Sequence, residues 1–195
     1  MRNAEIIRTT AETDIRLSLA LDGTGAGRVE TGVGFLDHML TLFARHGRFD
    51  LSVSCRGDTQ VDDHHSVEDV GIALGDAFAQ AIGEKRGVRR YAGMLLPMDE
   101  ALVLCAVDLS GRSCLRMQAS FPSQKIGTFD TELVEEFFAA FVRRAGVTLH
   151  LRQLDGTNSH HIAEAMFKAF GRTLSEAAAI DPRLGGEIPS TKGML

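Results

Sequence analysis

The sequence contains no tryptophan and only one tyrosine among its 195 residues. So few aromatic side chains leave little surface on which nucleic-acid bases could stack. The formal net charge of −5 also argues against binding to nucleic acid or to an anionic membrane surface. No apolar run reaches the roughly 20 residues of a membrane span, and the first residues lack the apolar segment of a signal peptide. We therefore expect neither a nucleic-acid nor a membrane partner.

Cysteine is also scarce. Cys55, Cys105 and Cys114 are odd in number and show no CxxC spacing. This pattern argues against a disulfide framework and favours reduced thiols in a cytoplasmic protein. The rest of the composition, 44% hydrophobic and 24% charged, is typical of a globular chain long enough to bury a core.

Hydrophobic periodicity predicts the same order of elements twice along the chain: three strands, a helix, a strand and a helix. In the first half we expect strands at 3–9 and 13–22, a glycine-rich hairpin leading to a third strand, a helix at 35–45 capped by Gly47, a strand at 49–55 and a helix at 64–83. In the second half we expect strands at 93–97, 101–109 and 112–119, a helix at 130–145, a strand at 148–154 and a helix from about 160. The GTGAG segment within the hairpin resembles a phosphate loop, but a strand rather than a helix is expected to follow it, which favours a turn. The chain thus divides into a first half at 1–83, a linker at 84–92, a second half at 93–182 and a tail at 183–195.

Two HHxxE clusters occupy equivalent places in this duplicated order. His64, His65 and Glu68 open the last helix of the first half, and the same pattern recurs 96 residues later as His160, His161 and Glu164. A single cluster could be a solvated helix start with acids near the positive end of the dipole. Its repetition at the equivalent position favours a metal site.

The helical spacing of these residues predicts two ions rather than one. His65 with Glu68 (i, i+3), or His64 with Glu68 (i, i+4), share a helix face. Adjacent residues point about 100° apart, so the two histidines of a pair are expected to serve different ions. Further imidazoles are then needed, and His38 and His150 are candidates because each precedes the cluster of its half.

Ligands of this kind suit Mn, Fe, Co, Ni or Zn, and the sequence does not choose among them. Neutral imidazoles need an acceptor at their second nitrogen. Four acids could act as that acceptor or simply as helix caps and surface residues: Asp37, Asp62, Asp63 and Asp69.

The segments GFLDHML, DDHHSVED, DEALVLCAVDLSGR, TLHLRQLDGTNSHHIAEAMFKAFGRTL and PSTKGML closely resemble the imidazoleglycerol-phosphate dehydratase family. The resemblance spans essentially the whole chain. It implies an α/β fold of the α+β, two-layer type, in which each half is a four-stranded sheet packed by two helices. It also implies a homo-oligomer, a 24-mer with active sites between neighbours, and two Mn²⁺ per subunit.

The resemblance further implies which residues form the site. The first ion would be bound by His38, His65, Glu68 and His160, and the second by His64, His150, His161 and Glu164. The implied reaction is dehydration of D-erythro-imidazole glycerol phosphate to imidazole acetol phosphate in histidine biosynthesis, a redox-neutral hydro-lyase reaction. Its expected course passes through an imidazolate and a diazafulvene-type intermediate. The metals are expected to take part together with His65, His161, Glu68 and Glu164. Glu12 is expected to move a proton on the glycerol chain.

The small-molecule substrate carries a phosphate, which needs cationic and hydroxyl donors. The resemblance implies substrate contacts from Arg90, Arg112, Lys168, Ser190 and Lys192. It implies further contacts from Glu12 and from six of the metal-site residues: His38, His64, His65, Glu68, His160 and His161. His46 is a further candidate, although a helix-end or core role fits it equally well. The tail carries glycine and proline without periodicity, and we expect it to be mobile and to order over the site when ligand binds.

Two other classes are compatible with clustered histidines. A ferritin-like metal-storage protein would use Glu-x-x-His on a four-helix bundle, whereas the order here is His-x-x-Glu beside clear strands. A zinc hydrolase of the HxxEH type would need histidine where Asp69 stands. Both are disfavoured.

Overall fold

The computed structural model describes residues 2–195, and its elements follow the predicted duplication. The first half contains β1 (Asn3–Thr9), β2 (Thr13–Ala20), β3 (Gly27–Glu30), α1 (Gly34–Gly47), β4 (Asp50–Gly57) and α2 (His64–Ile82). The second half contains β5 (Tyr91–Met98), β6 (Ala101–Asp108), β7 (Cys114–Gln118), β8 (Lys125–Ile126), β9 (Phe129–Asp130), α3 (Leu133–Ala145), β10 (Thr148–Asp155), α4 (Ser159–Ala178) and a short 3₁₀ turn (Pro182–Leu184). Strand β5 begins at Tyr91, two residues inside the expected linker.

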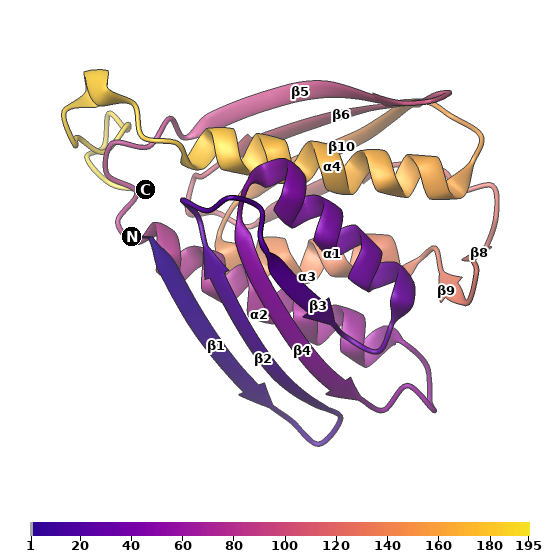
Figure 1. Cartoon of the computed structure of the whole chain (residues 1–195). Helices are drawn as coiled ribbons and strands as arrows, with labels where there is room; N and C mark the ends of the chain where they lie inside the picture. Colours follow the sequence, from indigo (N-terminus) through magenta and orange to yellow (C-terminus); the bar gives the residue numbers. More distant parts are fainter. Residues whose placement is uncertain (1) are drawn as a thin grey trace.

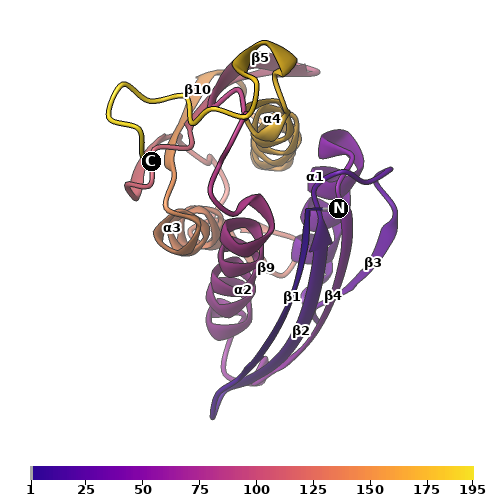
Figure 2. The ribbon, with the colours of Figure 1, turned by 90° about the vertical axis from the view of Figure 1, so that its left-hand side faces the viewer.

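Each half forms a four-stranded sheet covered on one face by its two helices, as expected. The strand orders, β1-β2-β4-β3 and β5-β6-β10-β7, are equivalent. The helices lie between the two sheets, with α1 packed against α4 and α2 against α3 (Figures 1 and 2). The alternation of buried and exposed residues along β2 and β6 reflects this arrangement, because only one face of each sheet meets the helices. The core therefore lies between the sheets and includes eight fully buried phenylalanines.

The prediction of a hairpin at the glycine-rich segment is wrong. Strand β3 pairs in parallel with β4, from Gly27 opposite Leu51 to Glu30 opposite Ser54. It has no place beside β2, because β1 and β4 already pair with both edges of that strand. The segment instead crosses the end of the sheet, where the Asp50 carboxylate accepts hydrogen bonds from the backbone amides of Thr24 and Ala26.

Gly47 does not cap α1 as predicted. The left-handed residue that ends this helix is Arg48, with φ 57°. Gly47 is buried one residue earlier, where an added Cβ would lie 2.7 Å from the carbonyl oxygen of Gly171 in α4. Its role is to let the two helices approach closely.

Three further features frame the site. The short hairpin β8–β9 was not predicted; its two-residue strands carry too little periodicity to be recognised. The tail returns to the connection after α2, where Arg90 donates to the Pro189 carbonyl at 2.8 Å. Within residues 2–195, no helix is both long and apolar enough to cross a membrane.

Candidate metal centre

The two HHxxE clusters lie in the first turns of α2 and α4, as the sequence predicts. Side-chain acceptors just before each helix hold the backbone of the histidine pair. Asp62 accepts from the His64 amide at 2.8 Å. Asn158 accepts from the amides of His160 at 2.9 Å and His161 at 3.3 Å. These contacts satisfy amides that have no partner within the helix, so each pair of imidazoles starts from a fixed backbone.

His38, His160 and Glu164, here called the His38 cluster, converge between α1 and α4. Each offers one ligand atom, and these atoms all lie within 4.8 Å of one another. Glu164 Oε2 lies 3.0 Å from His160 Nε2 and 3.5 Å from His38 Nε2. Ligand atoms bound to one ion at about 2.0–2.2 Å are separated by about 3–3.5 Å. The donor types and their spacing therefore fit a divalent cation.

Glu164 is poised to act as an anionic ligand. It is buried, and its second oxygen, Oε1, lies 2.5 Å from the Lys168 ammonium one turn further along α4. Burial alone would raise the pKa of Glu164, but the bond from Lys168 and the nearby imidazoles hold that pKa below its usual value. The carboxylate is thus kept charged and one oxygen remains directed at the two imidazoles.

Glu68 lies in the equivalent place on α2. It is 3.6 Å from His64 Nε2 and also accepts from Arg143 of α3 at 2.6 Å. In both clusters, then, the first histidine faces the glutamate four residues later, which is one of the two spacings that the sequence allowed.

The second histidine of each pair turns away from the first. The two rings are inclined by 85° in α2 and by 82° in α4, with centroids 6.2 and 6.3 Å apart. His65 Nδ1 lies 3.0 Å from Asp58, and its Nε2 lies 3.6 Å from Glu12. This divergence agrees with the expectation that neighbouring histidines serve different ions.

His161 has matching surroundings in the second half. Its Nδ1 lies 2.7 Å from Glu100 and its Nε2 lies 3.8 Å from Asp99, both in the turn between β5 and β6. The bond to Glu100 raises the pKa of His161, and the bond to Asp58 likewise raises the pKa of His65. Bonds from His161 and the Asn158 amide lower the pKa of Glu100 to about 2.

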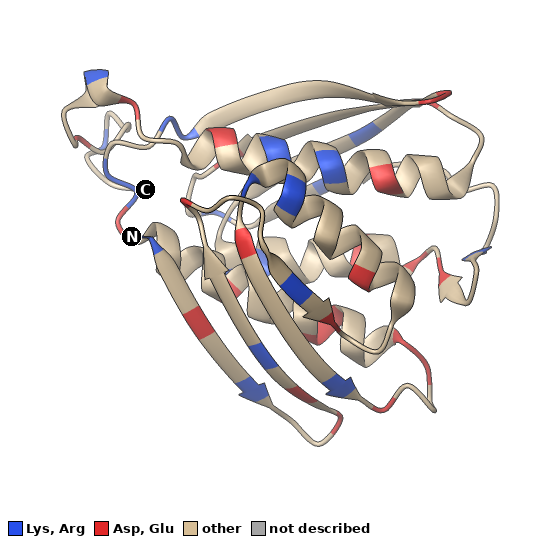
Figure 3. Cartoon of the chain, in the orientation of Figure 1, with Lys and Arg blue, Asp and Glu red and all other residues tan. Residues whose placement is uncertain are grey.

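Asp58, Asp99 and Glu100 were missed in the sequence, because turn acids are common and nothing local ties them to a histidine. Of the four acids that were proposed as imidazole acceptors, three have other partners. Within the part of the chain that the structure describes, Asp37 binds Thr31, and Asp62 binds the His64 amide. Asp69 binds Arg8 and Thr13. The Asp63 side chain makes no cap bond. Their contacts match the capping and structural alternative that the sequence left open. The loop between β4 and α2 that carries Asp58, Asp62 and Asp63 is visibly acidic (Figure 3).

One chain shows only part of the ligand groups that the family resemblance implies. Within it, Glu164, expected beside His64, His150 and His161, lies with His38 and His160. The grouping across neighbouring chains stays a prediction. His150 is exposed on the outer face of β10, level with Ala106 and Arg116 of the neighbouring strands. Among residues 2–195, only the His38 cluster brings three ligand atoms within 4.8 Å, so one chain does not assemble both expected groups by itself.

The candidate phosphate-binding residues lie in two places. Lys168 belongs to the edge of the His38 cluster. Arg90 binds Asp108 at 2.8 Å and the Pro189 carbonyl, which brings the tail with Ser190 and Lys192 to the start of β5. Arg112 follows β6, where its guanidinium contacts the Ser110 carbonyl.

His46 lies in the last turn of α1, and burial lowers its pKa, with Lys168 and Arg172 adding to the effect. Its expected substrate contact stays a prediction.

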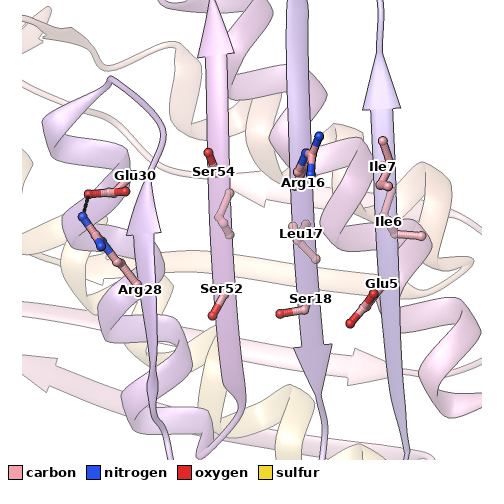
Figure 4. A pocket seen from close by; sticks show the side chains of 11 residues that line it. Glu5, Ile6, Ile7, Arg16, Leu17, Ser18, Arg28, Glu30, Ser52 and Ser54 are labelled. Carbon is pink, nitrogen blue, oxygen red and sulfur yellow. Dashed lines mark hydrogen bonds and ion pairs between the residues drawn. The ribbon is translucent and has the colours of Figure 1, made fainter.

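One hollow of the surface lies elsewhere. A shallow concavity of about 450 Å³ on the outer face of the first sheet is lined by Arg16, Arg28, Glu30, Ser52 and Ser54 among others (Figure 4). It contains none of the candidate ligands. The chemistry of the chain is therefore concentrated at the helix starts rather than in this hollow.

A duplicated α+β chain that presents paired imidazoles and carboxylates at two equivalent helix starts belongs to the class of candidate metalloenzymes. A family model described as imidazoleglycerol-phosphate dehydratase matches residues 31–174. The chain therefore belongs to the imidazoleglycerol-phosphate dehydratase family, and the prediction of a hydro-lyase is confirmed.

Curated relatives and solved structures agree with this assignment. Imidazoleglycerol-phosphate dehydratases from Methylorubrum extorquens and Jannaschia sp. are each 60% identical over 195 residues, which cover all of both chains. The crystal structure of the Staphylococcus aureus enzyme gives a TM-score of 0.84 at 42% identity, covering 92% of this chain and 99% of that one. The structure from Pyrococcus furiosus, in complex with (S)-C348, gives 0.84 at 35% identity, covering 97% and 100%. The two-sheet fold also excludes the ferritin-like alternative.

Proposed function

We propose that this chain dehydrates D-erythro-imidazole glycerol phosphate to imidazole acetol phosphate in L-histidine biosynthesis, in a reaction that depends on two Mn²⁺ per subunit. The observation that carries the proposal is the His38 cluster, a set of two imidazoles and one carboxylate at ligand spacing. It occurs in a chain that is 60% identical over its full length to dehydratases of this name.

The metals would be held by the residues of the two HHxxE clusters with His38 and His150. Positive charge at the ring nitrogens of the substrate would favour loss of the ring proton and expulsion of the hydroxyl group. Among the protein's own groups, Glu12 would serve as the acid–base for the glycerol chain, and its position 3.6 Å from His65 Nε2 supports this role. The Lys168 ammonium at the His38 cluster and the cations near the tail would bind the phosphate.

The same proposal includes assembly into a homo-oligomer, a 24-mer, in which neighbours complete the sites. It is supported by the incomplete ligand groups of one chain and by the exposed position of His150. The molecular mass in solution, measured by light scattering with and without Mn²⁺, tests it. A monomer with full activity would contradict shared sites.

We further propose that the C-terminal tail closes over bound substrate, and that the enzyme works in the cytoplasm. Arg90 already holds Pro189, immediately before the segment with Ser190 and Lys192. Truncation after Pro189 is expected to raise the Michaelis constant with a smaller effect on kcat. Unchanged kinetics of the truncated chain would count against closure.

The decisive experiment for the reaction is an assay of product formation from imidazole glycerol phosphate after chelation, with and without added Mn²⁺, together with metal analysis. We expect activity only with metal, and its loss in Glu164→Gln. The matched control is Glu84→Gln, because Glu84 is exposed and, within residues 2–195, pairs only with Arg86 in the connection after α2. Full turnover by the chelated protein would refute metal dependence.

A further inference from the structure

Both repeats place a carboxylate at Nδ1 of the second histidine of the pair. Asp58 lies 3.1 and 3.0 Å from His65 Nδ1 through its two oxygens, and Glu100 Oε2 lies 2.7 Å from His161 Nδ1. An ionised carboxylate only accepts hydrogen bonds, so each Nδ1 must carry the proton. In a neutral ring the lone pair is then at Nε2, the nitrogen that faces Glu12 in one cluster and Asp99 in the other.

These two acceptors are not products of the duplication. Asp58 directly follows β4. The two histidine pairs are 96 residues apart, and the residue 96 positions after Asp58 is Leu154, which cannot make the same contact. Glu100 comes instead from the turn between β5 and β6. The same contact is thus made from different parts of the fold, which indicates a requirement for the contact itself rather than inheritance of a shared loop.

Glu100 is also oriented by a second set of donors. Its Oε1 accepts from the backbone amides of Thr157 at 3.1 Å and Asn158 at 2.8 Å. These amides fix which oxygen points away from the histidine and leave Oε2 for His161. Asp58 differs, because both of its oxygens lie at nearly equal distances from His65 Nδ1.

We propose that Asp58 and Glu100 are positioning residues that hold His65 and His161 in the tautomer and orientation that present Nε2 to a divalent ion. The inference rests on the proposed metal-dependent function and deepens it. Partners of this kind orient metal-binding imidazoles and raise their basicity, and their loss typically weakens metal binding about 10–100-fold.

The test uses Mn²⁺ alone and measures its dissociation constant by calorimetry on metal-free full-length protein. In Glu100→Gln the amide oxygen can still accept from Thr157 and Asn158, so the side-chain NH₂ must face His161 and force its Nδ1 to become an acceptor. We therefore expect Mn²⁺ affinity to fall about 10–100-fold while the metal-free protein still folds and unfolds in one cooperative thermal transition. A residue needed only to hold the loop would tolerate glutamine.

Asp58→Asn is expected to weaken Mn²⁺ binding less, because the asparagine oxygen can occupy either of two equivalent places. Asp58→Ala removes the acceptor and should match the loss in Glu100→Gln. The matched control is Asp62→Asn in the same loop. Among the residues that the structure describes, Asp62 accepts only from the His64 backbone amide, and asparagine is an equally good cap. Its affinity should equal that of the wild type.

The outcomes separate this inference from the proposed function. Wild-type protein that binds Mn²⁺ and dehydrates the substrate, beside a Glu100→Gln variant of unchanged affinity, overturns the positioning role alone. Weakened Mn²⁺ binding in that variant, with no dehydration by the wild type, supports the positioning role and refutes the reaction. Wild-type protein that binds no Mn²⁺ overturns both.

Discussion

The close crossing of α1 and α4 allows a precise test of how packing sets the metal centre. His38 lies on α1 and Glu164 on α4, and the two helices meet further along at a pair of glycines, Gly47 and Gly171. A Cβ added at Gly171 would lie 2.5 Å from the Phe43 carbonyl oxygen. That oxygen belongs to the helix backbone, so it has no side-chain rotation available to relieve the clash.

The structure gives the size of the effect of Gly171→Ala. Ordinary contact begins at 3.4 Å, so the helices must separate locally by about 0.9 Å. Overpacking of this kind costs about 1–3 kcal/mol, and the better helix propensity of alanine returns about 1 kcal/mol. Because the clash involves rigid backbone, we expect a net loss of about 1–2 kcal/mol. For a chain of this length that lowers the thermal midpoint by about 2–8 °C.

The same displacement should loosen the 3.5 Å approach of His38 to Glu164 and weaken Mn²⁺ binding. Thermal unfolding of the metal-free protein and Mn²⁺ calorimetry measure the two effects separately. Gly34→Ala is the matched control, because Gly34 starts α1 and an added Cβ would meet nothing within 4 Å. A Gly171→Ala protein as stable as Gly34→Ala, with wild-type affinity, would refute the reasoning.

Four further outcomes follow from the contacts. Asp69→Asn, which removes the charge that binds Arg8 at 2.7 Å, should lower the free energy of unfolding by about 2 kcal/mol, measured in denaturant; no loss would show that this pair is not structural. Asn158→Ala should cost about 1 kcal/mol through the lost cap of α4, and Asn158→Asp should restore most of it in the same unfolding assay. In the metal-free protein, the raised pKa of His65 means that its bond to Asp58 stabilises the fold below the ordinary histidine pKa of about 6.5 and is lost as pH rises through the raised value. The gap in thermal midpoint between wild type and Asp58→Asn should therefore narrow from about pH 6 to pH 9, and a constant gap would contradict this sign. Finally, Mn²⁺ at 100 times its dissociation constant should stabilise the chelated protein by about 2.7 kcal/mol, visible as a rise in the thermal midpoint; a flat titration would show that the ion binds folded and unfolded chains alike.

Features carried by local periodicity could be predicted from the sequence. Strands β1 and β6 and helix α2 lie within a few residues of their expected ranges, because alternation and helical spacing are local signals. The two HHxxE clusters were also placed correctly at the starts of α2 and α4, since duplication made one cluster evidence for the other.

Features that depend on distant partners could not be predicted. The parallel pairing of β3 with β4 is decided by which strand edges remain free, and no pattern within 23–32 contains that information. The acceptors Asp58 and Glu100 reach their histidines only after the strands and turns are in place. The convergence of His38 with Glu164 likewise depends on the close crossing of α1 and α4, which two unremarkable glycines permit.

The position of the helices between the sheets makes each half incomplete by itself. Helices α1 and α2 bury one face against their own sheet and the opposite face against α4 and α3 (Figure 2). An isolated half would expose that second apolar face, and it would hold His38 without Glu164. Residues 1–83 and 84–195 should accordingly aggregate or stay partly unfolded when each is produced as a separate polypeptide. The two fragments should recover a stable fold on mixing. Such fragment complementation would match the descent of the chain from a protein that once paired with an identical copy of itself.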